Sequence, residues 1–188
     1  MRKLVVSEWV TLDGVFDADT MDQWFNPYHS DERAEYIQET ILASDALLLG
    51  GVTYEMLAPY WSSLKNNEMG IADRLNSAPK YVVSSTPLKA KWNNSTIIKE
   101  NVVEEVTKLK QQPGQDILIT GSGTLVQSLM QTDLIDEYKF LIHPIIMGSG
   151  KRFFKEGMDT TRLKLVKTKT FNLGVVLLCY QPAKNEQA

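Results

Sequence analysis

The stretch LITGSGTLV, Leu118–Val126, decides the fold that we predict for this chain. An apolar run typical of a buried strand stops at a Gly-Ser-Gly-Thr turn, and a helical pattern begins directly after it. Such a turn can simply change the direction of the chain, or it can present the free N–H groups of a helix start to a phosphate. Val126 stands where the six-residue dinucleotide fingerprint has its third glycine, so the turn alone does not decide between the two.

Outward from this turn, short apolar runs alternate with helical patterns. We expect helices over 31–43, 102–111 and 124–131, and another after Gly50 and Gly51. The expected strands are 3–10, 46–50, 80–85, 96–99, 116–121, 137–146, 163–171 and 174–180. This alternation predicts a three-layer α/β/α protein with a mixed, mostly parallel sheet. The last two strands follow each other across Asn172, Leu173 and Gly174, which leaves no room for a crossover helix and predicts an antiparallel C-terminal hairpin.

Two of the helices carry a pattern that predicts their buried side. Ala34, Ile37 and Ile41 repeat at helical spacing and should share one face. In the helix 102–111 the apolar stripe is Val102, Val106 and Leu109, and Asn101 with Glu104 has the spacing of a capping pair.

The composition is that of an ordinary globular protein. The chain has 188 residues, of which 43% are hydrophobic and 23% charged, with a net charge of -3. We therefore expect one domain over 1–182, a flexible tail over 183–188 and a cytoplasmic location, without a nucleic-acid or membrane partner. The one cysteine, Cys179, excludes an internal disulfide and a multi-cysteine zinc site, and we expect no metal.

Small and hydroxylated residues follow the ends of three expected parallel strands, where ligands of such sheets collect. Two of these turns carry glycines and lead into helices, which suits the two phosphates of a dinucleotide, and the third could hold a ribose through its hydroxyls. The residues are Gly50, Gly51 and Thr53; Ser84, Ser85 and Thr86; and Gly121, Ser122, Gly123 and Thr124.

At this point the residues match a family. The segments VTLDG (10–14), ASDALLLGGVTYEML (43–57), YVVSST (81–86) and ILITGSGTLVQSLMQTDLIDEYKFLIHPIIMGSGKRFF (117–154) occur in this order. Together they resemble the reductase domain of the bifunctional riboflavin-biosynthesis deaminase/reductase, which is a member of the dihydrofolate reductase-like superfamily. The cysteines of the deaminase half of that enzyme are absent from a chain with one cysteine.

The resemblance implies a mixed sheet flanked by helices, a homodimer, and NADPH as the cofactor. The pyrophosphate would lie on Gly50, Gly51 and Thr53 on one side, and on Gly121, Ser122, Gly123, Thr124 and Leu125 on the other. Ser84 and Ser85 would lie by the adenosine ribose and its 2′-phosphate. Gly51 replaces the arginine that dihydrofolate reductases place there, which favours the riboflavin branch and leaves NADH as an alternative cofactor.

The same resemblance places Asp13 and Gly14 by the nicotinamide and the substrate, beneath a covering segment that corresponds to 15–28. We take Asp13 as the candidate catalytic residue, although an Asp-Gly pair also forms plain turns. The candidate substrate contacts are Trp9, Gly14, Trp24, Tyr54 and Pro144, because flat heterocycles stack on aromatic rings. Packing in the core or in a dimer is the alternative for these aromatics, and for His143 a packed role is expected.

The function that these residues predict is transfer of hydride from NADPH to a small pyrimidine- or pteridine-like heterocycle, as in 5-amino-6-(5-phosphoribosylamino)uracil reductase. Two alternatives remain open. One is an NADP(H)-binding protein without turnover, and the other is a dihydrofolate reductase. The buried carboxylate that dihydrofolate reductases carry in their first long helix has no clear counterpart among Asp31, Glu32, Glu35 and Glu39.

Overall fold

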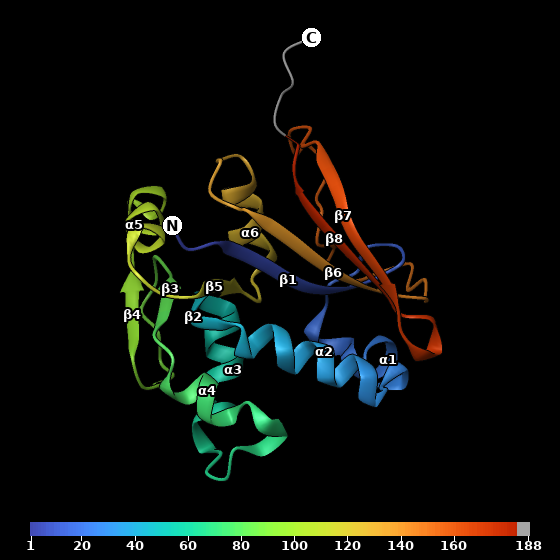
Figure 1. Cartoon of the computed structure of the whole chain (residues 1–188), viewed down its shortest axis with the longest axis horizontal. Coiled ribbons are helices and arrows are strands. Elements are labelled where there is room, and N and C mark those ends of the chain that lie inside the picture. Colours follow the sequence, from blue (N-terminus) through green and yellow to red (C-terminus); the bar gives the residue numbers. More distant parts are fainter. Residues whose placement is uncertain (184–188) are drawn as a thin grey trace.

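The computed structural model describes residues 1–183, and the predicted tail lies outside them apart from Ala183. One eight-stranded sheet runs through the molecule in the order β4-β3-β2-β5-β1-β6-β8-β7 (Figure 1). Its strands are β1 (Leu4–Thr11), β2 (Ser44–Gly50), β3 (Lys80–Val83), β4 (Ser95–Ile98), β5 (Asp116–Ile119), β6 (Glu137–His143), β7 (Leu163–Thr170) and β8 (Val176–Pro182). All of the predicted strands are present.

The strands from β4 to β6 are parallel to their neighbours, whereas β8 runs antiparallel to β6 and to β7. The predicted mixed sheet with a C-terminal hairpin is therefore confirmed. The helices are α1 (Met21–Trp24), α2 (Asp31–Leu42), α3 (Gly51–Ser63), α4 (Ala72–Ser77), α5 (Val102–Gln111) and α6 (Gly123–Met130), with short 3₁₀ turns between them. Within residues 1–183, none of the helices combines the length and the apolar character needed to cross a bilayer.

The apolar residues of the parallel strands alternate between two cores, as the two-residue period of a strand requires. In β1, Leu4, Val6 and Val10 belong to a core that also contains residues of α5 and α6. Val5 belongs to the core on the other face of the sheet, together with residues of α3 and α4. Figure 1 shows the resulting layers, with α5 and α6 on one side of the sheet and α2, α3 and α4 on the other.

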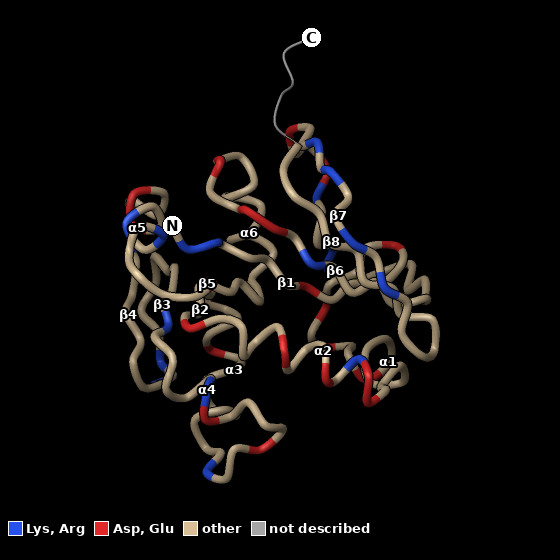
Figure 2. The backbone as a smooth tube through the Cα atoms, in the orientation of Figure 1, with Lys and Arg blue, Asp and Glu red and all other residues tan. Residues whose placement is uncertain are grey.

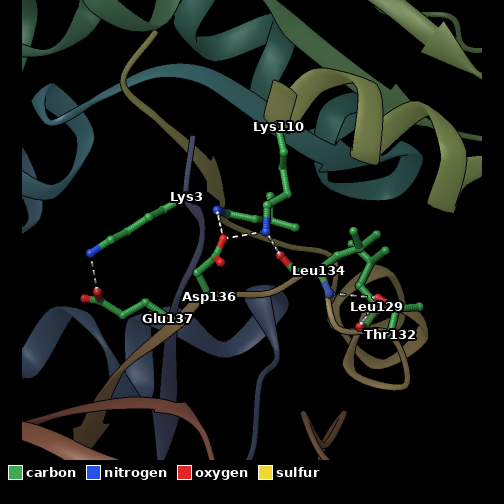
Figure 3. Close-up of polar contacts among 8 residues, drawn as sticks. Lys3, Lys110, Leu129, Thr132, Leu134, Asp136 and Glu137 are labelled. Carbon is green, nitrogen blue, oxygen red and sulfur yellow. Dashed lines mark hydrogen bonds and ion pairs between the residues drawn. The ribbon is translucent and has the colours of Figure 1, made fainter. Parts of the chain in front are cut away.

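A buried lysine joins the ends of α5, β1 and β6 (Figure 3). The side chain of Lys110 is 4% exposed, and its Nζ lies 2.6 Å from Oδ2 of Asp136 and also donates to the carbonyl of Leu134. The same Asp136 oxygen accepts a hydrogen bond from the backbone N–H of Leu4 at 2.7 Å. A buried charge is tolerated only when it is paired and hydrogen-bonded in this way, so the contacts fix the start of β1 against α5.

Three local predictions were wrong. Asn101 has φ +54° and makes no side-chain cap on α5, because a residue in the left-handed region cannot aim its amide at the first turn. Ala34 is exposed, and the residues of α2 that the fold buries most are Arg33 and Thr40. The strand predicted over 137–146 ends at His143, since Pro144 has no N–H group with which to continue the ladder.

Candidate functional site

Three of the predicted turns, far apart in the sequence, meet at the carboxyl ends of β3, β2 and β5. The backbone N–H of Gly50 donates to the carbonyl of Gly121 at 3.3 Å. A Cβ atom on Gly51 would lie 2.8 Å from Oγ of Ser84, and one on Gly121 would lie 2.6 Å from Oγ1 of Thr53. A side chain at either glycine would collide with Ser84 or Thr53, so glycine lets the three turns lie directly against one another.

Two helix starts lie at these turns. Gly50 is the N-cap of α3 and provides no side-chain cap, so the first N–H groups of that helix depend on other partners. Ser122 is the N-cap of α6, and its Oγ accepts from the N–H of Leu125 at 3.3 Å. The peptide between Gly121 and Ser122 is cis. Two neighbouring helix N-termini make a favourable place for the negative charge of a pyrophosphate.

The hydroxyl-bearing turn after β3 is held in place by α3. Glu55 of that helix accepts from the backbone N–H of Ala90 at 3.1 Å, and the hydroxyl of Tyr54 accepts from the N–H of Trp92 at 2.9 Å. Within the turn, Oγ of Ser84 donates to the carbonyl of Thr86 at 2.9 Å, while Ser85 is exposed. Tyr54 is 2% exposed and packs in the core with Trp92. It therefore positions this turn and does not join the other predicted substrate contacts.

A carboxyl group that the sequence analysis did not single out is buried against the glycine turn after β5. Glu8 of β1 is 2% exposed, and its Oε1 accepts from the N–H of Gly121 at 2.7 Å. Burial raises the pKa of Glu8 to about 8, so the group keeps its proton at neutral pH. Its signal in the sequence is one acidic residue inside the apolar run of β1.

Asp13 lies at the far end of β1 and holds the loop that follows β6. Its carboxylate accepts from the hydroxyl of Thr11 at 2.6 Å and from the N–H groups of Met147 and Gly148 at 3.1 Å and 2.9 Å. The Thr11 hydroxyl, helped by these N–H groups, lowers the pKa of Asp13 to about 2. The group is ionised at neutral pH and fully engaged in hydrogen bonds, which suits a positioning role better than donation of a proton.

The covering segment brings aromatic rings to the ends of β1 and β6. Phe25 stacks on Trp9 with ring centroids 4.4 Å apart, and Trp24 lies edge-on to His143 at 5.3 Å. Trp24 is 2% exposed and donates its Nε1–H to the carbonyl of Asp17. Of the predicted substrate contacts, the fold gathers Trp9 here, with Pro144 just after β6 and Gly14 just after β1. Trp24 lies beside them but is buried, like Tyr54.

His143 is a packed histidine, as expected from the sequence. It has no exposed surface, and its Nδ1 lies 3.2 Å from the carbonyl of Val10 while its Nε2 lies 2.9 Å from Nη1 of Arg33. Because Arg33 can only donate, the imidazole is neutral with its proton on Nδ1. Burial and the charge of Arg33 lower the pKa of His143 to about 4.

These features define the class of protein. An eight-stranded, mostly parallel sheet with an antiparallel C-terminal hairpin, glycine turns at adjacent strand ends and a covering segment is the dihydrofolate reductase-like α/β fold. Residues 2–177 match the family model described as the RibD C-terminal domain, and the chain belongs to this family. The resemblance carried by the segments from 10–14 to 117–154 is therefore confirmed.

Relatives extend over almost the whole chain. The Bacillus subtilis (strain 168) protein YyaP is 29% identical over 182 residues, which are 95% of this chain and 94% of that protein. A pyrimidine reductase-like protein from Corynebacterium diphtheriae has a TM-score of 0.69 at 14% identity, covering 98% of this chain and 93% of its own. The Enterococcus faecalis dihydrofolate reductase complexed with NADP(H) has a TM-score of 0.65 at 16% identity, covering 96% and 97%. These two structures establish the shared fold.

Proposed function

We propose that this protein is an NADPH-dependent reductase of a small pyrimidine- or pteridine-like heterocycle, similar to 5-amino-6-(5-phosphoribosylamino)uracil reductase. The observation that carries the proposal is the convergence of the turns after β2, β3 and β5 into one surface with two helix N-termini. The RibD C-terminal domain family and the NADP(H) bound by the similar dihydrofolate reductase support it.

The residues at the turns suit a dinucleotide. The pyrophosphate would be held by the helix starts at Gly50–Thr53 and Gly121–Leu125, where glycine allows the closest approach of the backbone. The exposed hydroxyl of Ser85, next to Ser84, would meet the adenosine ribose and the 2′-phosphate. A Cβ atom on Gly50, Gly51 or Gly121 would collide with Ser122, Ser84 or Thr53, so these glycines allow the turns to lie together. The start of α3, which has no side-chain cap, is thereby placed beside the start of α6, and the residues present fit the group.

The nicotinamide supplies a hydride when it is bound, and the chain's own work is to position the reacting partners and exclude water. Trp9 and the covering segment provide a flat apolar wall at the substrate end. Asp13 holds the loop after β6 against Gly14. Glu8 keeps its proton because it is buried, and it accepts a hydrogen bond from the N–H of Gly121, so we assign it a positioning role for that turn.

The environment of α2 argues against folate reduction. The charged side chain that α2 buries is the cation Arg33. Asp31, Glu35 and Glu39 are exposed, and Glu32 pairs with Lys169 at 2.9 Å. A buried carboxylate that could hold a pterin is therefore missing from this helix, in agreement with its sequence.

Titration of the purified protein with NADPH and with NADH, followed by nucleotide fluorescence, tests the cofactor assignment. We expect saturable binding with preference for NADPH, and absence of saturable binding by either nucleotide would refute the proposal. Oxidation of NADPH is then followed against pyrimidines and pteridines, with dihydrofolate as a separate arm. Binding without oxidation of NADPH against any of them would instead establish a nucleotide-binding protein without turnover.

A further inference from the structure

Glu8 is a buried acid with one oxygen engaged by the protein and the other free. The residue is 2% exposed, and its Oε1 accepts from the backbone N–H of Gly121 at 2.7 Å. Its Oε2 has no hydrogen-bond partner within residues 1–183, and the fully enclosed side-chain atom without a partner in this range is Nε of Arg33. Oε2 therefore reaches accessible space. Because it belongs to the same carboxyl group as Oε1, this opening lies at the turn after β5.

Apolar side chains and one tyrosine surround this carboxyl group on its face of the sheet. The residues beside it on β1, β5 and β6 are Val6, Val10, Ile119, Tyr138, Phe140 and Ile142. Tyr138, the ionisable residue among them, is neutral at pH 7 because burial raises its pKa to about 12. Helix α6, which packs on the same face, has no ionisable side chain. Burial among these groups raises the pKa of Glu8 to about 8, so the carboxyl group is a neutral acid at pH 7.

The charged groups of the neighbouring loops and of α3 are bound to other partners. Beyond the end of β1, Asp13 pairs with Arg152 at 3.6 Å, and Asp17 lies 3.7 Å from Lys151. Glu55 of α3 accepts from the turn after β3. In the part of the chain that the structure describes, none of these groups forms an ion pair or a hydrogen bond with the buried carboxyl group, so its ionisation would have no cation to compensate it.

The free oxygen opens at the place that the proposed function gives to the pyrophosphate. Gly121 is followed by Ser122, the N-cap of α6, and a Cβ atom on Gly121 would touch Thr53 of α3. A neutral carboxyl group carries an O–H, and a hydrogen bond from it to a phosphate oxygen is short and strong because the acceptor is charged. The ionised form of Glu8 has no proton to donate and would repel the phosphate. The site therefore suits an anion only while Glu8 is protonated.

We propose that Glu8 is a residue of the cofactor site that acts in its protonated form, donating the O–H of Oε2 to a phosphate oxygen of the bound nicotinamide nucleotide. Binding of the nucleotide and retention of this proton are then linked, so that each favours the other to the same extent. This inference rests on the proposed function, since it names a further contact of the same cofactor.

Dissociation constants measured by nucleotide fluorescence from pH 7 to pH 9.5 test the linkage. NADPH and NADH should behave alike, because the 2′-phosphate that distinguishes them ionises at about pH 6, below this range. The affinity of the unaltered protein for either nucleotide should fall at least tenfold across the range, since the bound state holds the proton more tightly than the free state. In Glu8→Gln the amide keeps a donor and an acceptor and does not ionise, so the affinity should change less than threefold.

Two other ionisable residues serve as references in this experiment. Lys80, at the start of β3, loses its proton in the same range because burial lowers its pKa to about 8, but it is unaltered in the variant. The difference between the unaltered protein and Glu8→Gln therefore reports Glu8. Glu100→Gln, at an exposed glutamate, should keep the full dependence on pH.

Calorimetry in two buffers of different ionisation enthalpy measures the linked proton directly, and it needs no variant to be decisive. At pH 8.5 the unaltered protein should take up part of a proton with each nucleotide bound, and Glu8→Gln should take up none. Equal pH dependence in these two proteins, or no proton uptake by the unaltered protein, would overturn the contact. Absence of saturable binding by either nucleotide at pH 7 would instead overturn the proposed function itself, so the two failures are distinguishable.

Discussion

At the scale of the residue, burial determines what the acidic groups near the turns can do. Glu8 lies in β1 and Asp13 lies just after its end. Hydrogen bonds to Asp13 lower its pKa to about 2, whereas desolvation raises the pKa of Glu8 to about 8. One group is therefore a permanent charge at neutral pH, and the other is a neutral acid. This difference in environment fits the two roles: ionised Asp13 accepts from the loop after β6, and neutral Glu8 accepts from the turn after β5.

The first prediction concerns the stability contributed by protonated Glu8. Its pKa in the folded protein, about 8, exceeds its ordinary value of 4.5, so the unfolded state loses the proton first and the free energy of unfolding falls as pH rises between these values. His143 has the opposite effect, but only between about 4 and 6.5. Between pH 6.5 and 8 we expect Glu8 to cost about 1.5 kcal/mol, or roughly 3–6 °C in Tm.

Thermal unfolding of Glu8→Gln at pH 6.5 and 8 checks this prediction. The amide keeps the acceptor oxygen for the N–H of Gly121 and cannot ionise, so the decrease in Tm should disappear. Glu100→Gln, at an exposed glutamate, is the matched control and should retain the decrease. An equal decrease in the unaltered protein and in Glu8→Gln would show that Glu8 is not its source.

At the scale of the element, the turn between β5 and α6 depends on one glycine. Gly121 has φ +91°, and a Cβ atom there would lie 2.6 Å from Oγ1 of Thr53. Gly121→Ala should therefore separate this turn from α3 and weaken NADPH binding at least tenfold. Gly157 has φ +79° with open space around it, so Gly157→Ala has a similar backbone cost of roughly 1–2 kcal/mol without the collision.

Fluorescence titration with NADPH, accompanied by thermal unfolding, separates the two effects. Both variants should lose stability, but only Gly121→Ala should lose affinity for the nucleotide. Similar NADPH affinities in the two variants would mean that the contact between Gly121 and Thr53 does not shape the cofactor site.

We predict that the hydroxyls of the turn between β3 and β4 meet the 2′-phosphate of NADPH. This turn should then determine the preference between NADPH and NADH. Ser85 is exposed beside Ser84, whose Oγ lies against Gly51 at the start of α3. Ser85→Asp should weaken NADPH binding about tenfold through repulsion between like charges, with little effect on NADH. Ser85→Arg should shift the ratio of the two dissociation constants in the opposite direction, and an unchanged ratio in both variants would place the 2′-phosphate elsewhere.

At the scale of the whole molecule, β7 leaves one edge of the sheet without a neighbouring strand. Val166 is 53% exposed on this strand, next to Leu165 at 49%, and lysines run along the same strand (Figure 2). The unpaired backbone groups of an edge strand can pair with another chain, and the lysines of this strand restrict such pairing, so Leu165 and Val166 are its apolar contact points. The homodimer that the family resemblance implies remains a prediction, and we expect this edge to take part in it.

Light scattering after size exclusion measures the oligomeric state directly. We expect twice the mass of one chain for the unaltered protein and the mass of one chain for Val166→Lys. Val103 on α5 is similarly exposed, at 50%, and Val103→Lys should leave the dimer intact. A single chain mass for the unaltered protein would end the dimer prediction, and a dimer that tolerates Val166→Lys would move the interface away from β7.

The central strands β1, β2 and β5 were predictable because each is a short apolar run that is buried along nearly its whole length. The glycine turns were also found, since glycine before a helical pattern has few structural reasons to occur twice in one chain. Tyr54 was predicted to contact substrate, but it points into the core. Its direction is determined by how α3 packs on β3, which the sequence does not show. Arg33 was missed because a basic residue in a polar helix resembles a solvent-exposed one.

The sequence by itself determined the order of strands and helices, the hairpin at the end of the sheet and the residues able to approach a phosphate. Each of these depends on residues that are close together in the chain, because the spacing of apolar residues sets the element type and glycine sets the conformations that a turn can adopt. Only the tertiary structure decided that Glu8 keeps its proton, that Asp13 is hydrogen-bonded to the loop after β6 and that Arg33 has no acidic partner. Each depends on desolvation and on partners that are distant in the sequence, and these exist only once the sheet has formed.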